Sequence, residues 1–304
     1  MVGKIRNLIT LLRIRQYYKN AMIFIGIFFS ESLFDISLYF SLILGFILLC
    51  CASSFNYIVN DIRDINLDKL HSEKLNKKPL ASGALSVRFA LLMMFILAAI
   101  ITFSLIFLLP NLGFTLMILL IIVTGQLYNH FFKHYAFIDI IILSTGYLWR
   151  TLAGCILIDK FVSAWLFLSI FEIAIFLSIA KRKEDLKFLD KDVALKHKKA
   201  YDQYSLKLLE QFYTIIAGSL FITYSLYLIF KFNLFEPGIP TYELIAVATI
   251  PLALYILMRY MYLTSAKPTI ARNPEKAFFD KGIIITALII IVILFFAFYF
   301  DVIL

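Results

Sequence analysis

Four polar side chains follow a long apolar run at the spacing of a helical face: Asn60, Asp61, Asp64 and Asp68, in the stretch NDIRDINLD. Residues three or four positions apart lie on the same side of an α-helix. If the helix continues past residue 60, three carboxylates crowd one face and repel each other unless a cation lies among them. Mg²⁺ characteristically takes one or two carboxylates together with substrate phosphates. The spacing predicts a Mg²⁺ site on Asp61, Asp64 and Asp68. A solvated helix end, neutralised by the neighbouring basic residues, remains the alternative.

The elements that must position these residues are membrane helices. The chain is 62% apolar and contains 31 Phe, whereas soluble domains are nearer 45–50% apolar. About 20 apolar residues are needed for one helical crossing. We predict an all-α, polytopic membrane protein of nine transmembrane helices, forming one domain over residues 1–304. The predicted spans are 17–35, 38–59, 88–109, 112–132, 137–158, 162–180, 210–230, 243–263 and 282–302.

Basic residues gather on one side of this predicted topology. The N-terminal segment and the connections 60–88, 181–208 and 259–281 hold most of them, whereas the opposite connections hold only Lys160 and Lys231. Cytoplasmic loops carry this excess of Lys and Arg. We therefore expect the N-terminus and the polar connections to be cytoplasmic in an integral protein of the cell membrane, with no cleavable signal. The net charge of +9 then reflects topology, and no nucleic-acid partner is expected.

Several common kinds of site have no signature here. Cys50, Cys51 and Cys155 all fall within predicted spans, at spacings that fit neither a metal cluster nor a disulfide framework. No Walker loop or dinucleotide fingerprint is present. We expect the three cysteines to pack as small apolar residues.

A second polar group lies at the connection 128–139, YNHFFKHYAFID, with Tyr128, Lys133 and Asp139. The following predicted span contains Arg150. Because a charge inside the membrane is costly and normally faces the bundle interior, we predict that Arg150 pairs with Glu172 in the next span.

A third polar group, AKRKED, lies where the sixth predicted span ends. Lys181 and Arg182 stand beside Glu184 and Asp185. Arginine and lysine are the natural donors to phosphate, but a cationic cluster at a membrane exit can also act only as a topology anchor.

Together these three groups resemble the UbiA superfamily of intramembrane prenyltransferases, over nearly the whole chain. The stretch from Asn60 to Asp68 is similar to that family's first aspartate-rich motif. RIRQYYKN, PLASG, GYLWRTLAG and AKRKED resemble its decaprenyl-phosphate phosphoribosyltransferase branch. The chain departs from that branch in reading His71-Ser72 and Lys78-Pro79 where His-Pro and Arg-Pro are usual.

The resemblance implies a UbiA-like bundle with a cytoplasmic-side active site, a donor, 5-phosphoribose 1-diphosphate (PRPP), and an acceptor, a membrane-embedded polyprenyl phosphate. Asp61 and Asp64 would be catalytic through Mg²⁺ on the leaving diphosphate, with Asp68 as a further metal ligand and Asn60 orienting that shell. The implied substrate-binding residues are Lys19, Lys74, Lys77, Lys78, Tyr128, Lys133, Asp139, Lys181, Arg182 and Glu184.

Two other functions are weighed against this one. A prenyl group could move from a prenyl diphosphate to an aromatic or other small acceptor, because the same metal-bound aspartates would serve. The basic AKRKED stretch favours instead a donor with an additional phosphate. A transporter or membrane scaffold would need a polar path across the bilayer, and the nearly uncharged outward connections do not supply one.

Overall fold

Helices are the only regular secondary structure in the part of the chain that the computed structural model describes, and no strand occurs there. The described residues are 2–69, 78–188, 199–235, 238–266, 270 and 274–303. The prediction of an all-α protein is confirmed.

Eight helices within these ranges are long and apolar enough to cross a membrane. They match eight of the nine predicted spans, because apolar length defines both the predicted spans and these helices. The ends agree within four residues except at Lys187, which lies seven residues beyond the predicted end at residue 180. The eight are Ile36–Arg63, Val87–Leu108, Leu112–His130, Ile138–Leu157, Ala164–Lys187, Leu206–Lys231, Thr241–Ala266 and Lys281–Phe300.

The first predicted span, 17–35, does not form one long helix. A 3₁₀ helix, η1 (Ile14–Phe24), leads into a short helix, α2 (Ile25–Phe29). Asn20 within η1 is buried, and its Oδ1 accepts hydrogen bonds from Ser53 and Arg150. Because this segment directs a polar side chain into the protein, it is a packed internal element. This explains why the apolar segment 17–35 does not form the long helix that its hydropathy predicts.

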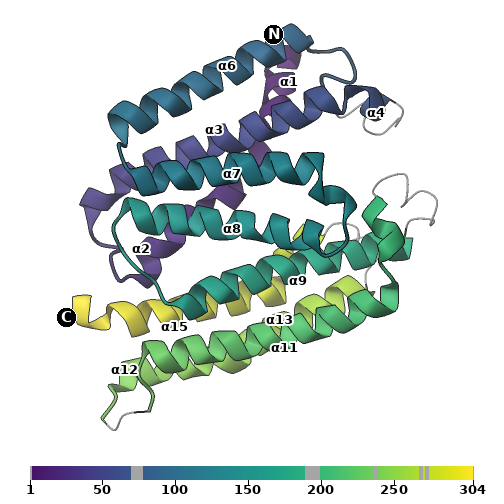
Figure 1. Cartoon of the computed structure of the whole chain (residues 1–304). Coiled ribbons are helices and arrows are strands. Elements are labelled where there is room, and N and C mark those ends of the chain that lie inside the picture. Colours follow the sequence, from purple (N-terminus) through teal and green to yellow (C-terminus); the bar gives the residue numbers. More distant parts are fainter. Residues whose placement is uncertain are drawn as a thin grey trace. The chain divides into compact units, whose positions relative to one another are not determined.

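The chain divides into two compact units. The first comprises Met1–His130 and Gly146–Phe161, and α3 lies between α6 and α7 in it (Figure 1). Besides η1 and α2 its elements are α1 (Val2–Leu12), η2 (Ile36–Leu38), α3 (Tyr39–Arg63), α4 (Ile65–Lys69), α6 (Val87–Phe103), the π-helical turn η3 (Ser104–Leu108), α7 (Leu112–His130) and the second part of α8 (Ile138–Leu157).

The core of the first unit depends on close approach of backbones. Ile23, Leu48 and Phe114 are fully buried in it. Gly154 of α8 lies against η1 so closely that a Cβ there would be 1.9 Å from the Ile23 carbonyl oxygen. Small residues at such crossings allow membrane helices to pack closely.

The second unit comprises Phe131–Thr145 and Val162–Leu304. Two of its helices, α9 and α11, pack along each other, as do α13 and α15 (Figure 1). A stacked pair, Phe176 and Tyr213, lies in its core with Leu209 and Leu263. Besides the first part of α8 its elements are η4 (Phe132–His134), α9 (Ala164–Phe188), η5 (Lys199–Gln203), α11 (Leu206–Lys231), α12 (Thr241–Leu244), η6 (Ile245–Ala248), α13 (Thr249–Ala266), η7 (Pro274–Phe279) and α15 (Lys281–Ile303).

Large apolar side chains remain exposed along the long helices. Phe95 of α6 is 73% exposed, and Ile285 of α15 is 57% exposed. In water these surfaces would favour association, whereas in a bilayer they face acyl chains at no cost. The chain is an integral membrane protein.

Candidate active site

The aspartate-rich stretch remains helical through a single turn residue. α3 ends at Arg63, the backbone N–H of Asp64 donates to the carbonyl oxygen of Asn60, and that of Asp68 donates to the carbonyl of Asp64. The helical spacing is thereby carried into α4. Asp61 and Asp68 are almost fully buried, whereas Asn60 and Asp64 are partly exposed.

One ammonium group joins the two buried carboxylates. The Nζ of Lys78 lies 3.1 Å from Oδ1 of Asp61 and 2.5 Å from Oδ2 of Asp68. Asp61 also accepts a hydrogen bond from Nη2 of Arg13 at 2.8 Å. Buried charges are tolerated when they are paired in this way. Asp61 and Asp68 therefore converge on one cation.

Arg13 is a member of this cluster that sequence reasoning missed, because the sequence shows it only as one of several basic residues of the N-terminal segment. Arg13 adopts the left-handed conformation, with φ 53° and ψ 43°. Its guanidinium group lies 4.4 Å from the centre of the Tyr57 ring, in cation–π contact. Non-glycine residues held in this region cluster at functional sites. Two contacts and a turn conformation together fix this side chain at Asp61.

A cavity of about 860 Å³ opens beside Asp61 and Lys78, within the range typical of ligand pockets. Four cationic side chains line it and face a single carboxylate, that of Asp61. Such a surface suits a ligand that carries phosphate groups. The four cations are those of Arg6, Arg13, Arg15 and Lys78.

The predicted three-aspartate metal site has two convergent members. In the part of the chain that the structure describes, no group of three or more His, Cys, Asp or Glu side chains could hold a metal ion. Asp61 and Asp68 nevertheless direct one oxygen each at a shared cationic atom. Mg²⁺ is commonly held by one or two carboxylates, with substrate phosphates completing its shell. The residues present fit such an ion, whereas the metal-binding role of Asp64 stays a prediction.

Asp139 and Arg182 are partners of each other within the second unit. Nε of Arg182 donates to Oδ2 of Asp139 at 2.9 Å, and the Tyr204 hydroxyl donates to Oδ1 at 2.7 Å. Both charged side chains are buried. Substrate contact by either residue stays a prediction, and the contacts observed are those of a buried structural pair.

Glu184 lies in an unusual setting on α9. Its side chain is 1% exposed, and neither carboxylate oxygen has a hydrogen-bond partner among the described residues. The nearest cation, Nζ of Lys183, is 3.8 Å away and also lies over the Tyr213 ring. Lys181 at the same helix end is exposed. The predicted roles of Lys181 and Glu184 in substrate binding stay predictions.

The other predicted contact residues are spread along the chain. Nζ of Lys19 lies 3.5 Å from Oε1 of Gln16. Tyr128 near the end of α7 and Lys133 in η4 are each partly exposed. The predicted residues Lys74 and Lys77 lie outside the described residues.

The predicted ion pair between Arg150 and Glu172 is wrong. Nε of Arg150 donates to Oδ1 of Asn20 at 2.7 Å, and its Nη1 donates to the carbonyl oxygen of Gly146. Glu172 accepts from the Ser219 hydroxyl. Neutral amide, hydroxyl and carbonyl groups thus take the place of the expected charge.

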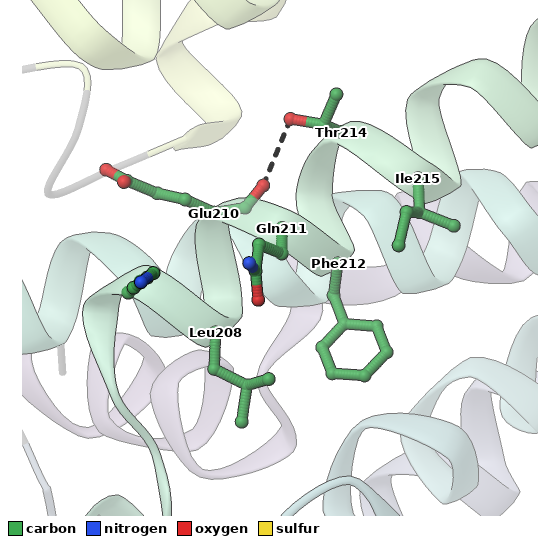
Figure 2. A pocket seen from close by; sticks show the side chains of 7 residues that line it. Leu208, Glu210, Gln211, Phe212, Thr214 and Ile215 are labelled. Atoms are coloured by element: carbon green, nitrogen blue, oxygen red, sulfur yellow. Dashed lines mark hydrogen bonds between the residues drawn. The ribbon is translucent and has the colours of Figure 1, made fainter.

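A second recess lies along the beginning of α11, with a volume of about 600 Å³. Its lining residues, Leu208, Glu210, Gln211, Phe212, Thr214 and Ile215 among them, all come from this one helix (Figure 2). The hydrogen bond in this view joins the Thr214 hydroxyl to the Glu210 carbonyl oxygen. Polar groups from separate elements do not meet there, and the recess has the character of a helix surface.

The arrangement in the first unit, with carboxylates, cations and a cavity at one place, is the candidate active site. The model of the UbiA prenyltransferase family matches residues 21–280 of this chain. The chain belongs to the UbiA prenyltransferase family. It is a transferase.

Named relatives and a solved structure agree with this membership. The chain is 26% identical to a decaprenyl-phosphate phosphoribosyltransferase of Mycolicibacterium smegmatis, over 73% of this chain and 70% of that protein. It is also 26% identical to a protein of the same name from Corynebacterium glutamicum, over 73% and 67% of the two chains. A UbiA homolog from Archaeoglobus fulgidus, bound to GPP and Mg²⁺, superposes with a TM-score of 0.67 at 18% identity, covering 97% of this chain and 99% of that one. The fold is the UbiA fold.

Proposed function

We propose that this UbiA family transferase moves the 5-phosphoribosyl group of PRPP to a polyprenyl phosphate. The observation that carries the proposal is the polar cluster of the first unit: two buried carboxylates converge on one cation at the wall of a cavity lined by four basic side chains. The names of the relatives support the choice of donor and acceptor.

The reaction exchanges one C1–O bond of the ribose for another. A phosphate oxygen of the acceptor forms the new bond to C1, the bond to the diphosphate breaks, and the diphosphate leaves with that electron pair. The acceptor phosphate is already largely ionised near neutral pH, so no strong base is required from the protein.

The chain's own side chains bind and orient the donor. Asp61 and Asp68 would hold Mg²⁺, which when bound supplies positive charge to the departing diphosphate. Arg13 keeps Asp61 in place through their 2.8 Å contact. Arg13 and Lys78 also offer N–H donors to phosphate oxygens in the cavity, where developing negative charge is stabilised.

The setting of the site is part of the proposal. We infer that Asn60 and Asp64 belong to the same donor site, together with the predicted lysines Lys74, Lys77 and Lys78. We also infer that this site opens to the cytoplasm and that residues 1–304 act as one domain. The excess of basic residues in the connections of the predicted topology supports this orientation.

The proposal is tested with purified protein, Mg²⁺, PRPP labelled in the ribose, and a polyprenyl phosphate. We expect the label to move into a product that partitions into organic solvent, and this transfer to stop when EDTA removes the metal. Transfer of a prenyl group from a prenyl diphosphate to a phenolic acid, with no labelled lipid from PRPP, would refute the proposal in favour of the prenyltransferase alternative.

A further inference from the structure

The N-terminal helix α1 presents one face to the cavity of the candidate site. The α1 residues that line the cavity are Gly3, Arg6, Asn7, Ile9 and Thr10. Gly3, Arg6, Asn7 and Thr10 recur at three- and four-residue steps and so share a side of the helix. Another side of α1 is anchored by Leu11, which is fully buried among Ile58 of α3, Leu80 and residues of α6. A packed helix therefore positions Arg6 at the cavity.

The four cationic side chains that line the cavity differ in whether they contact a carboxylate. Arg13 and Lys78 are engaged with Asp61. For the exposed side chains of Arg6 and Arg15, no ion pair or hydrogen bond to another described residue occurs. An arginine on a cavity wall without such a contact offers its full fork of donors, a geometry that matches a phosphate group.

We propose that Arg6 and Arg15 form a subsite for the phosphate monoester of the sugar donor, its 5-phosphate. This inference rests on the proposed function and assigns a second phosphate position within the same cavity. Asp61, Asp68 and Lys78 lie at the diphosphate end, and the N-terminal arginines receive the phosphate at the other end of the ribose.

A prenyl diphosphate donor would explain the two exposed arginines less well, and the AKRKED stretch is a less suitable place for the 5-phosphate. A prenyl diphosphate carries no phosphate group apart from its diphosphate, so it would leave these two arginines without a ligand. Arg182, the arginine of the AKRKED stretch, is buried and donates to Asp139. The exposed arginines of the cavity are the better receptors.

The double variant Arg6→Gln/Arg15→Gln tests the subsite. The two fragments of the donor serve as separate probes: ribose 5-phosphate carries only the monoester, and inorganic diphosphate with Mg²⁺ represents the leaving group. We expect the inhibition constant of ribose 5-phosphate and the KM for PRPP to rise about tenfold or more, because charge-assisted hydrogen bonds are lost. The inhibition constant of diphosphate and the KM for polyprenyl phosphate should stay within about twofold.

Two further double variants serve as controls for this test. Lys4→Gln/Arg88→Gln removes the same charge from exposed positions that do not line the cavity, and it should leave all four constants unchanged. Arg6→Lys/Arg15→Lys keeps the charge without the fork and should recover part of the ribose 5-phosphate affinity. The subsite is overturned if Lys4→Gln/Arg88→Gln raises the same constants as Arg6→Gln/Arg15→Gln does. It is also overturned if Arg6→Gln/Arg15→Gln weakens the binding of ribose 5-phosphate and of diphosphate equally.

Anionic lipid is a second source of phosphate, and it is distinguished by repeating the assays in uncharged detergent and in phosphatidylglycerol vesicles. A defect seen only with the anionic vesicles assigns the arginines to head groups and overturns the proposal. If the wild-type protein transfers phosphoribose while the variant keeps its KM for PRPP, the subsite alone fails. If the wild-type protein neither transfers phosphoribose nor responds to ribose 5-phosphate, the proposed function fails and the subsite falls with it.

Discussion

Lys78 occupies the position between two buried carboxylates that a divalent cation would take. Its Nζ is within 3.1 Å of both Asp61 and Asp68, so the protein supplies its own counter-charge at this point. The ammonium group holds the two carboxylates together. If Mg²⁺ binds there, as we propose, this group must yield or share that position, and metal affinity would then be coupled to the conformation of the Lys78 side chain.

The variant Lys78→Met separates the contribution of the lysine ammonium group to stability from that of bound Mg²⁺. Without the ammonium group, two buried carboxylates face each other and the guanidinium of Arg13 contacts only Asp61 of the two, and breaking a buried pair costs about 3–5 kcal/mol. We expect the unfolding temperature in EDTA to fall, and added Mg²⁺ to raise it more than in the wild-type protein, because an ion that binds only the folded state stabilises it. Lys160→Met, at an exposed position, is the control. Equal responses of wild type and Lys78→Met to Mg²⁺ would contradict this role.

Asp61 is the residue on which the cluster depends, since both Arg13 and Lys78 contact its Oδ1. Asp61→Asn keeps the shape but removes the charge. We expect phosphoribosyl transfer to fall by about 100-fold or more, the scale of losing one electrostatic contact to developing charge. Asp159→Asn is the matched control, because Asp159 is exposed and its φ of 50° suits asparagine equally well. Activity that survives in Asp61→Asn would exclude this carboxylate from the chemistry.

At the scale of elements, one carboxylate ties three segments of the second unit together. Asp139 lies in the first turn of α8, Arg182 comes from α9, and Tyr204 follows η5. Because both oxygens of Asp139 are occupied and buried, the connection before α11 is held to the end of α9 by polar contacts as well as by packing.

This tie predicts a pH dependence at the alkaline end. Burial, and the hydrogen bond to Asp139, raise the pKa of the Tyr204 hydroxyl above its usual value near 10.0. The unfolded chain therefore loses this proton first, and the contribution to stability is present below pH 10 and is lost as pH rises further. In Tyr204→Phe the unfolding temperature should fall less steeply above pH 10 than in the wild type. Tyr135→Phe, at an exposed position, should keep the wild-type slope, and parallel slopes for all three would refute the assignment.

The elements that hydropathy defines could be predicted from the sequence, and so could the helical spacing of Asp61 and Asp68, because both are local properties. The contacts that complete the polar clusters could not. Arg150 donates a hydrogen bond to Asn20, 130 residues away in the sequence. The high cost of a buried charge predicts that Arg150 has a polar partner, but it does not identify which residue that is. The left-handed turn at Arg13 also gave no signal, since no glycine or asparagine marks it.

At the scale of the molecule, the described part of each compact unit contains a buried cluster of paired charges. Arg13, Lys78 and their two aspartates belong to the first unit, and Asp139 with Arg182 to the second. Charge in a membrane protein is retained where it is paired or functional. The cluster of the second unit is closed by its own partners, whereas that of the first opens on a cavity, and this difference supports our proposal that the chemistry takes place in the first unit.

A site for a water-soluble donor must open to the compartment that supplies it, so the orientation of the chain can be tested independently of activity. After Cys50, Cys51 and Cys155 are replaced by alanine, a single cysteine is introduced at Ala84 or at Phe161, both exposed positions between long helices. The excess of basic residues predicts that Ala84 is cytoplasmic and Phe161 external. In intact cells, a membrane-impermeant maleimide should label Phe161→Cys at once and Ala84→Cys only after permeabilisation. Labelling of Ala84→Cys in intact cells would reverse the orientation and place the candidate site outside the compartment where a sugar diphosphate donor is made.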